Sequence, residues 1–288
     1  MYQWRKGIAQ WRVADTLYLS VPFTWLLPEA RNLAQTADCR VIAGGPAVDL
    51  MPKYLAGMTE SGVPVGKALA MHNPLATRTS EGCPNACPFC INQTKALREL
   101  TEWESLPVVI DDNFLATSAT HQEEATLRLA HLPIVDFNQG LQASLFRGDA
   151  ITRLQRLHLR LRFAWDDVRS EVAVMGAIGR AKAAGLRDIR CYVLVGYNDT
   201  PEDARYRCET LDRAGVMPNP MRFQPLDALA KNSHVGDGWT NPELIRFCRY
   251  WAQHSHTAGV PYEEFDDRRT ARALARLSQQ RLGLEATQ

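Results

Sequence analysis

Residues 82–90 read Gly82-Cys83-Pro84-Asn85-Ala86-Cys87-Pro88-Phe89-Cys90. Three residues separate the first two cysteines, and two residues separate the second from the third. Pro84 and Pro88 restrict their own φ angles and cannot continue regular structure, so the segment is predicted to be a loop wrapped around a bound group. Three thiolates this close together fit one metal centre and leave one coordination position open. Phe89 stands beside the last cysteine, where it can shield that centre from water.

Two kinds of metal centre are compatible with the loop. An iron–sulfur cube held by three cysteines keeps its fourth iron free for a substrate. A structural zinc needs four tetrahedral ligands, but the sequence has no second cysteine pair, and the nearest histidines are the distant His72 and His121. The seven cysteines are odd in number, which disfavours a disulfide framework. The residues favour an iron–sulfur cluster on Cys83, Cys87 and Cys90, and a non-catalytic zinc module stays open as the alternative.

This stretch resembles the CxxxCxxC signature of the radical S-adenosylmethionine enzymes, including the aromatic residue before the last cysteine. The resemblance implies a 4Fe-4S cluster whose open iron binds the amino and carboxylate groups of S-adenosylmethionine. It further implies reductive cleavage to methionine and a 5'-deoxyadenosyl radical, which abstracts hydrogen from a substrate. The implied partners are an electron donor such as flavodoxin or ferredoxin and a substrate that the sequence does not identify.

Beyond the cysteines, short apolar runs alternate with amphipathic stretches. Strands are expected at residues 75–80, 106–111, 134–138, 159–165, 188–195 and 220–225. Helices are expected at residues 91–100, 121–131, 149–157, 168–184 and 201–214. This alternation predicts an α/β fold with a parallel sheet and helices outside it. Six such units fit the partial (β/α)6 TIM-like barrel that the resemblance implies.

The amino-terminal residues predict a smaller α/β segment. Strands are expected at residues 17–21 and 39–43, and helices at residues 26–37 and 48–55, as in part of a Rossmann-like layer. Residues 41–55 also resemble the end of the cobalamin-binding domain that precedes many radical S-adenosylmethionine cores. No Asp-x-His-x-x-Gly occurs upstream of the cysteines, so we expect a reduced remnant, and a cobalamin-dependent methylase is the third hypothesis.

The expected domain organisation has three parts. Residues 1–72 form the Rossmann-like segment, residues 73–227 the radical S-adenosylmethionine core, and residues 228–288 a helical extension with helices at 242–254 and 266–282.

Polar residues follow several of the expected strands, where the chemistry of α/β barrels collects. By the resemblance, Asp111, Asp112 and Asn113 match the second-strand motif that binds the amino group of S-adenosylmethionine, and Asp112 is the preferred acceptor. Gly196 and Tyr197 resemble the fifth-strand motif that contacts the adenine. The further residues expected to face ligand or substrate are Asn138, Gln139, Asp166 and Arg222. Asp199 and Thr200 are the two candidate caps of the helix that Pro201 begins, and Asp166 and Asp167 are candidate caps of the helix expected from residue 168.

Charge and hydropathy argue against two kinds of partner, nucleic acid and membranes. The 288 residues include 33 basic and 32 acidic side chains, a net charge of +1, which gives no global field for a polyanion such as nucleic acid. The uncharged run at residues 16–28 is too short to span a bilayer and contains Pro22 and Pro28, so no membrane partner is expected. Reduced thiols and an oxygen-sensitive cluster predict a cytoplasmic protein.

Overall fold

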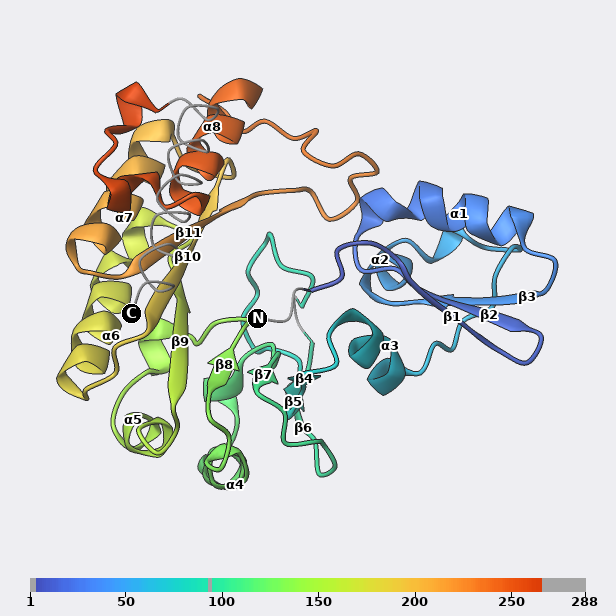
Figure 1. The fold of residues 1–288 in the computed structure, drawn as a ribbon, viewed down its shortest axis with the longest axis horizontal. Helices are drawn as coiled ribbons and strands as arrows, with labels where there is room; N and C mark the ends of the chain where they lie inside the picture. Colours follow the sequence, from blue (N-terminus) through green and yellow to red (C-terminus); the bar gives the residue numbers. More distant parts are fainter. Residues whose placement is uncertain (1–3, 93–94, 266–288) are drawn as a thin grey trace, which may run out of the picture. The chain divides into compact units, whose positions relative to one another are not determined.

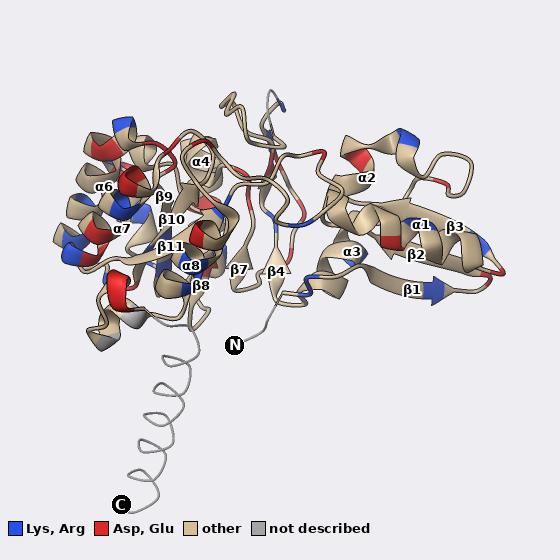
Figure 2. Cartoon of the chain, turned by 90° about the horizontal axis from the view of Figure 1, so that it is seen from above, with Lys and Arg blue, Asp and Glu red and all other residues tan. Residues whose placement is uncertain are grey.

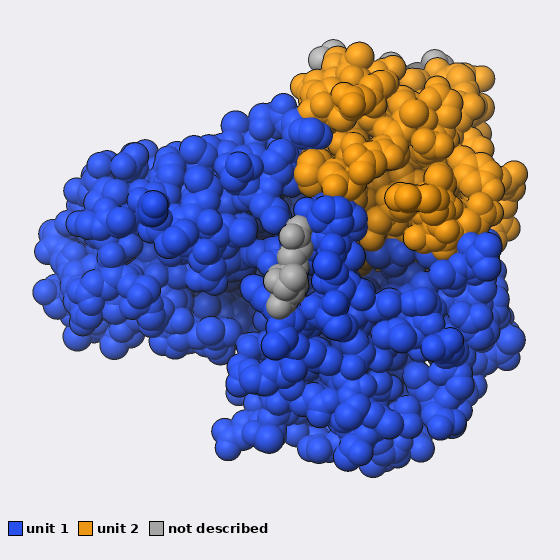
Figure 3. All heavy atoms as spheres, turned by 180° about the vertical axis from the view of Figure 1, so that it is seen from behind, with its two compact units in different colours: residues 1–164, 172–189, 224–234 blue, residues 165–171, 190–223, 235–288 orange. Residues whose placement is uncertain are grey.

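The computed structural model describes residues 4–92 and 95–265. The chain divides into two compact units, which Figure 3 colours separately. The first comprises residues 1–164, 172–189 and 224–234, and the second comprises residues 165–171, 190–223 and 235–288. In the described ranges no helix is long and apolar enough to cross a membrane. The expected division at residues 72 and 227 stays a prediction, and the helix expected at 266–282 lies outside the described residues.

The core of the fold is a six-stranded, all-parallel sheet (Figure 1). Its strands stand side by side in the order in which the chain forms them. They are β4 (Ala76–Thr77), β7 (Val108–Val109), β8 (Val135–Phe137), β9 (Leu159–Ala164), β10 (Ile189–Val195) and β11 (Met217–Arg222). A doubly wound sheet reverses its strand order at a switch point, whereas this order runs in one direction, as in an α/β barrel. The prediction of an α/β fold with a six-stranded parallel sheet is confirmed.

Helices join the strands from β7 onward and follow β11. They are α4 (Ala119–Leu129), α5 (Asp149–Leu154), α6 (Glu171–Ala183), α7 (Pro201–Arg213) and α8 (Asn241–Ala252). The start of α7 follows from local chemistry, because the Thr200 side chain accepts the Asp203 N–H, Asp203 caps in return, and Pro201 opens the first turn. Short 3-10 turns cover Thr24–Leu26, Pro52–Tyr54, Phe114–Ala116, Ala143–Leu145, Val168–Ser170, Ser255–Ala258 and Tyr262–Glu264.

The connection between β4 and β7 differs from the prediction. A helix was expected at residues 91–100, but the described residues of this segment contain none. Instead β5 (Ser80–Glu81) pairs antiparallel with β6 (Arg98–Glu99) and closes the cysteine loop as a hairpin. The Leu100 N–H donates to the Thr79 carbonyl (2.8 Å), which extends this pairing. Backbone pairing across the loop base therefore overrides the weak helical periodicity of the sequence.

The amino-terminal segment is a three-stranded sheet with helices. Its elements are β1 (Ala9–Val13), β2 (Thr16–Ser20), α1 (Leu27–Thr36), β3 (Arg40–Gly44), α2 (Pro46–Leu50) and α3 (Val65–His72). Strand β2 pairs antiparallel with β1 and parallel with β3, while α1 makes the crossover between β2 and β3. Strand β1 was not among the expected strands. The helix expected at 48–55 begins earlier, at Pro46, and ends at Leu50 before a 3-10 turn.

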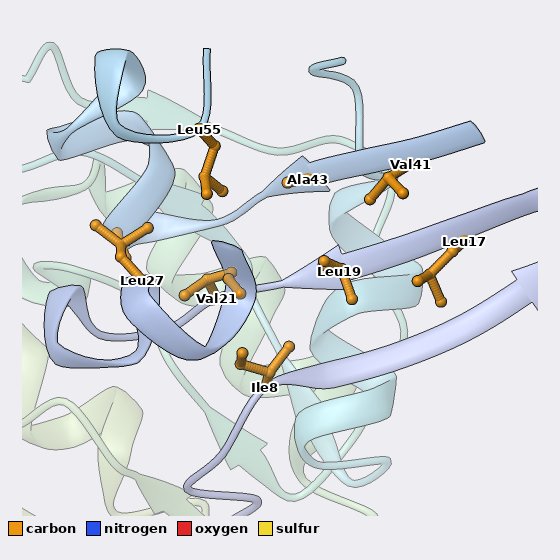
Figure 4. Close-up of a cluster of buried hydrophobic side chains, with 10 residues drawn as sticks. Ile8, Leu17, Leu19, Val21, Leu27, Val41, Ala43 and Leu55 are labelled. Atoms are coloured by element: carbon orange, nitrogen blue, oxygen red, sulfur yellow. The ribbon is translucent and has the colours of Figure 1, made fainter. Parts of the chain in front are cut away.

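This segment has its own apolar core, drawn in Figure 4. Leu17 and Leu19 of β2, Val41 of β3 and Leu27 of α1 are buried and converge between the sheet and α1. Each fully buried aliphatic side chain stabilises the fold by about 1.5–3 kcal/mol. The apolar runs that predicted the strands thus also supply this core.

Charged side chains are interspersed. On α7, Figure 2 shows basic and acidic residues mixed along the helix. This mixing agrees with the small net charge of +1.

Candidate metal centre

The three cysteines lie on the loop between β5 and β6. All three thiols are half-buried and none is in a disulfide. The Cys90 N–H donates to the Cys87 carbonyl (3.0 Å), so these two residues form a tight turn. Within the described ranges, no three His, Cys, Asp or Glu side chains converge on a single-ion site. In an iron–sulfur cube the thiolates bind different irons, so their sulfurs stand farther apart than around one ion.

Gly82 allows the two limbs of this loop to approach each other. Its φ is +86°, a left-handed conformation that favours glycine, and an added Cβ would lie 2.2 Å from the Ala96 carbonyl oxygen. The Cys83 N–H donates to the Lys95 carbonyl at 3.1 Å across the same gap. A larger residue at position 82 would therefore push apart the strands that present Cys83.

Two of the cysteine sulfurs accept N–H hydrogen bonds. The Asn113 side-chain amide donates from Nδ2 to Cys83 Sγ at 3.4 Å, and the Asn92 backbone N–H donates to Cys90 Sγ at 3.4 Å. A metal-bound thiolate carries negative charge and accepts such bonds, which tune cluster potentials. The donors around these sulfurs thus fit a cluster of the predicted kind.

Three side-chain amides connect the loop to the ends of β7 and β8. Gln142 Oε1 accepts hydrogen bonds from Asn113 Nδ2 (2.7 Å) and from Asn85 Nδ2 (2.9 Å). Gln142 Nε2 donates to Ser144 Oγ (2.8 Å). We call Asn85, Asn113 and Gln142 the carboxamide network. It holds the cysteine loop in one position relative to two strand ends.

The two residues after Asp111 have different partners. The Asp112 carboxylate accepts the Gly82 N–H (2.8 Å) and lies 3.8 Å from the Arg78 guanidinium, so it tethers the start of the cysteine loop. Asn113 is buried, and its Oδ1 has no hydrogen-bond donor among the described residues. Asn113 is therefore better placed than Asp112 to accept a hydrogen bond from a ligand.

Asp111 is a buried structural acceptor. Its carboxylate takes hydrogen bonds from the Thr79 N–H (2.6 Å), the Thr79 hydroxyl and the Ser80 hydroxyl (2.9 Å). Burial raises the pKa of Asp111, while these hydrogen bonds act in the opposite direction. The Thr79 hydroxyl also lies 3.0 Å from His121 Nε2. These bonds fix the end of β4 against the end of β7.

In the loop after β8, the side chain that contacts the cysteine loop belongs to neither of the two expected residues, whose contact with a ligand stays a prediction. The Asn138 backbone N–H donates to the Val109 carbonyl (2.8 Å), and its side chain is half-buried, whereas Gln139 is exposed. Gln142, which was not among the expected site residues, is the one whose side chain reaches the cysteine loop. Gly140, with φ +89°, turns the chain between Gln139 and Gln142. Gly140 was the sequence signal that could have indicated a turn bringing Gln142 to the site. Asn85, inside the cysteine motif itself, was also missed.

In the second unit, Gly196 lies in a tight turn after β10. Its φ is +77°, its N–H donates to Asp199 Oδ1 (2.7 Å), and an added Cβ would meet Leu244 Cδ2 at 3.0 Å. Tyr197 packs against Phe223, with ring centroids 4.7 Å apart. Glycine at this position lets Leu244 pack close to the backbone, and the expected adenine contact stays a prediction.

The same turn depends on a buried ion pair that sequence reasoning missed. Arg207 of α7 is fully buried and donates to the Asp199 carboxylate and to the Trp165 carbonyl (2.8 Å). Trp239 Nε1 donates to the Asp199 carbonyl (3.0 Å). Asp199 is thus an ion-pair partner, not the helix cap, and Thr200 is the cap. Burial raises the pKa of Asp199 although Arg207 acts in the opposite direction.

The remaining expected residues lie nearby in this unit. Burial raises the pKa of Asp166 to about 6, against the attraction of Arg207. Its neighbour Asp167 has its pKa lowered to about 2, mainly by its hydrogen bonds with Arg169, and caps the turn Val168–Ser170. Burial lowers the pKa of the Arg222 guanidinium. Asp166 is therefore the more easily protonated of the two adjacent carboxylates.

The expected site residues fall into two groups. The first unit contains the three cysteines with Asp112, Asn113, Asn138 and Gln139, and the second contains Asp166, Gly196, Tyr197 and Arg222. No protein-family model, curated protein or solved structure matches this chain. Function is therefore inferred from the residues and from the geometry within each unit.

Proposed function

We propose that this chain is a radical S-adenosylmethionine enzyme whose Cys83, Cys87 and Cys90 bind one 4Fe-4S cluster. When bound, the cluster would supply the electron that cleaves S-adenosylmethionine to methionine and a 5'-deoxyadenosyl radical, which takes hydrogen from the substrate. The observation that carries this proposal is the cysteine loop itself. It presents three thiols without a disulfide, and N–H donors from Asn113 and Asn92 point at two of the sulfurs.

The sheet supports the proposal through its strand order. Six parallel strands in sequential order are the arrangement of the partial (β/α)6 TIM-like barrel that we propose for the core. The three strands of residues 9–44, with their α1 crossover, are in our proposal a reduced Rossmann-like segment.

Within the first unit, each side chain has a separate task. Asp112 holds Gly82 and so presents Cys83, while the buried Oδ1 of Asn113 accepts a hydrogen bond from the ammonium group of S-adenosylmethionine. A buried acceptor left without a donor costs about 1–3 kcal/mol, which a bound ammonium would offset. The electron donor is a one-electron protein such as flavodoxin or ferredoxin, and the substrate is not identified.

The test is anaerobic reconstitution with iron and sulfide, followed by dithionite, S-adenosylmethionine and chromatography for 5'-deoxyadenosine. The wild type should form the product, and Cys87→Ala should abolish it. Cys39→Ala is the matched control, because Cys39 is also half-buried but lies beside the amino-terminal core and should leave the yield unchanged. Absence of product, together with stoichiometric zinc in the protein as isolated, would establish the structural metal module instead.

A further inference from the structure

The carboxamide network contacts the cysteine loop at two points. Asn85 lies inside the loop, between the first two cysteines, and Asn113 touches the sulfur of Cys83. Both side chains donate to the same oxygen of Gln142. Gln142 therefore fixes the position of the loop and the direction of the Asn113 amide at the same time.

The orientation of the Asn113 amide follows from its surroundings. A metal-bound thiolate can only accept a hydrogen bond, so the atom of Asn113 that faces Cys83 has to be Nδ2. That nitrogen also faces Gln142 Oε1 at 2.7 Å, where an oxygen of Asn113 would be repelled. The reversed amide would thus lose both bonds, which fixes the N–H dipole of Asn113 toward the sulfur.

Resting on the proposed function, we propose that Asn113 and Gln142 are positioning residues that set the reduction potential of the cluster. An N–H dipole aimed at a ligating sulfur stabilises the more negative, reduced state and therefore raises the potential. All three members of the network are uncharged, so this effect comes from dipoles and adds no net charge to the site. Gln142 acts through Asn113, because it holds the donor in line with Cys83.

The proposal predicts a graded series of potentials. Asn113→Leu removes the donor and should shift the midpoint of the loaded protein to lower potential. Gln142→Leu keeps the donor but frees it to rotate, so it should give a smaller shift in the same direction. Gln155→Leu is the matched control, since Gln155 is an exposed carboxamide after α5 whose side chain donates to the Ala184 carbonyl (2.8 Å), and it should keep the wild-type potential.

The experiment is an electron paramagnetic resonance measurement on reconstituted protein poised at a series of potentials, without S-adenosylmethionine. Leaving out this ligand separates the role of the Asn113 nitrogen from that of its oxygen. A purely structural role would lower the iron content and leave the midpoint of the loaded fraction unchanged. If Asn113→Leu binds the cluster and has the midpoint potential of the wild type, the proposal is overturned. If Asn113→Leu does not bind the cluster, the same result in Gln142→Leu overturns it.

Failure of this inference is distinguishable from failure of the proposed function. A wild type that takes up no iron and sulfide would refute the proposed function. A wild type that loads and forms 5'-deoxyadenosine, beside variants that share its midpoint, would refute only the role of the carboxamide network.

Discussion

The cysteine loop and the turn after β10 are both held in place by side chains from other elements, but by different forces. The neutral amides of Gln142 and Asn113 hold the loop, together with Gly82, whose N–H donates to the Asp112 carboxylate. A fully buried ion pair between Arg207 and Asp199 holds the turn. A loop and a turn are thus each held in place by side chains that lie outside them, with different chemistry. The carboxamide network supplies uncharged dipoles to its loop, whereas the turn after β10 depends on two opposite buried charges.

The two arrangements differ in what happens when one partner is removed. An amide that loses its partner leaves a dipole, at a cost of about 1–3 kcal/mol. A buried carboxylate that loses its arginine becomes an uncompensated charge, at a cost of about 3–5 kcal/mol. We therefore expect the turn after β10 to be the less tolerant of substitution.

The largest effect is expected for Arg207→Met. It leaves Asp199 buried without its cation and the Trp165 carbonyl without its donor, so the free energy of unfolding should fall by about 3–5 kcal/mol. Urea unfolding followed by fluorescence measures this change. The matched control is Arg205→Met on the same helix, whose half-exposed ion pair with Glu263 should contribute only about 0–1 kcal/mol.

The double variant Arg207→Met with Asp199→Asn tests whether charge causes the loss. The introduced asparagine side chain would keep an acceptor for the Gly196 N–H and carry no charge, so part of the lost stability should return. No recovery would mean that Arg207 stabilises the unit through its packing and its hydrogen bond to the Trp165 carbonyl, not through its charge.

The next effect is expected for Gly82→Ala. Its Cβ would fall 2.2 Å from the Ala96 oxygen at a positive φ, so the loop should be strained by about 1–3 kcal/mol and should bind less iron on reconstitution. Gly179→Ala is the matched control, since nothing lies within 4 Å of its Cβ on helix α6, and it should stabilise the protein by up to about 1 kcal/mol. Equal iron content in both variants would show that the cysteine loop does not need glycine at position 82 to bind iron.

The smallest effect concerns pH. Because the folded-state pKa of Asp166 is raised from 3.8 to about 6, its contribution to stability is present below pH 4 and is lost as the pH rises toward 6. Solvent access to the half-buried carboxylate limits this contribution to about 1 kcal/mol. Asp166→Asn should remove the loss, as measured by urea unfolding at pH values from 4 to 7.

Its neighbour provides the control of opposite sign. The folded-state pKa of Asp167 is lowered to about 2, so its contribution is present above pH 4 and is lost as the pH falls toward 2. Asp167→Asn should therefore change the pH dependence of the free energy of unfolding below pH 4, and Asp166→Asn should change it between pH 4 and 6. If both variants change the same pH range, the two carboxyl groups titrate as one system.

Prediction from sequence succeeded where the signal was local. Apolar periodicity identified the six strands of the parallel sheet, and Thr200 with Pro201 marked the start of α7. Prediction failed where partners are remote in the chain. Asn85 and Gln142 are 57 positions apart, and Arg207 meets the Trp165 carbonyl across 42 positions. Neither pair has a periodic signal, because contacts of this kind arise only when the strands are placed side by side.

The sequence by itself determined that Cys83, Cys87 and Cys90 share one proline-bearing loop, because proline and residue spacing act on the backbone locally. It also determined the α/β alternation, which follows from side-chain periodicity. Only the tertiary structure decided that Asn113 faces the Cys83 sulfur and that Gln142, not Gln139, reaches the loop. The physical reason is that hydrogen bonds depend on angles and distances set by the packing of several strands, and no single stretch of sequence encodes them.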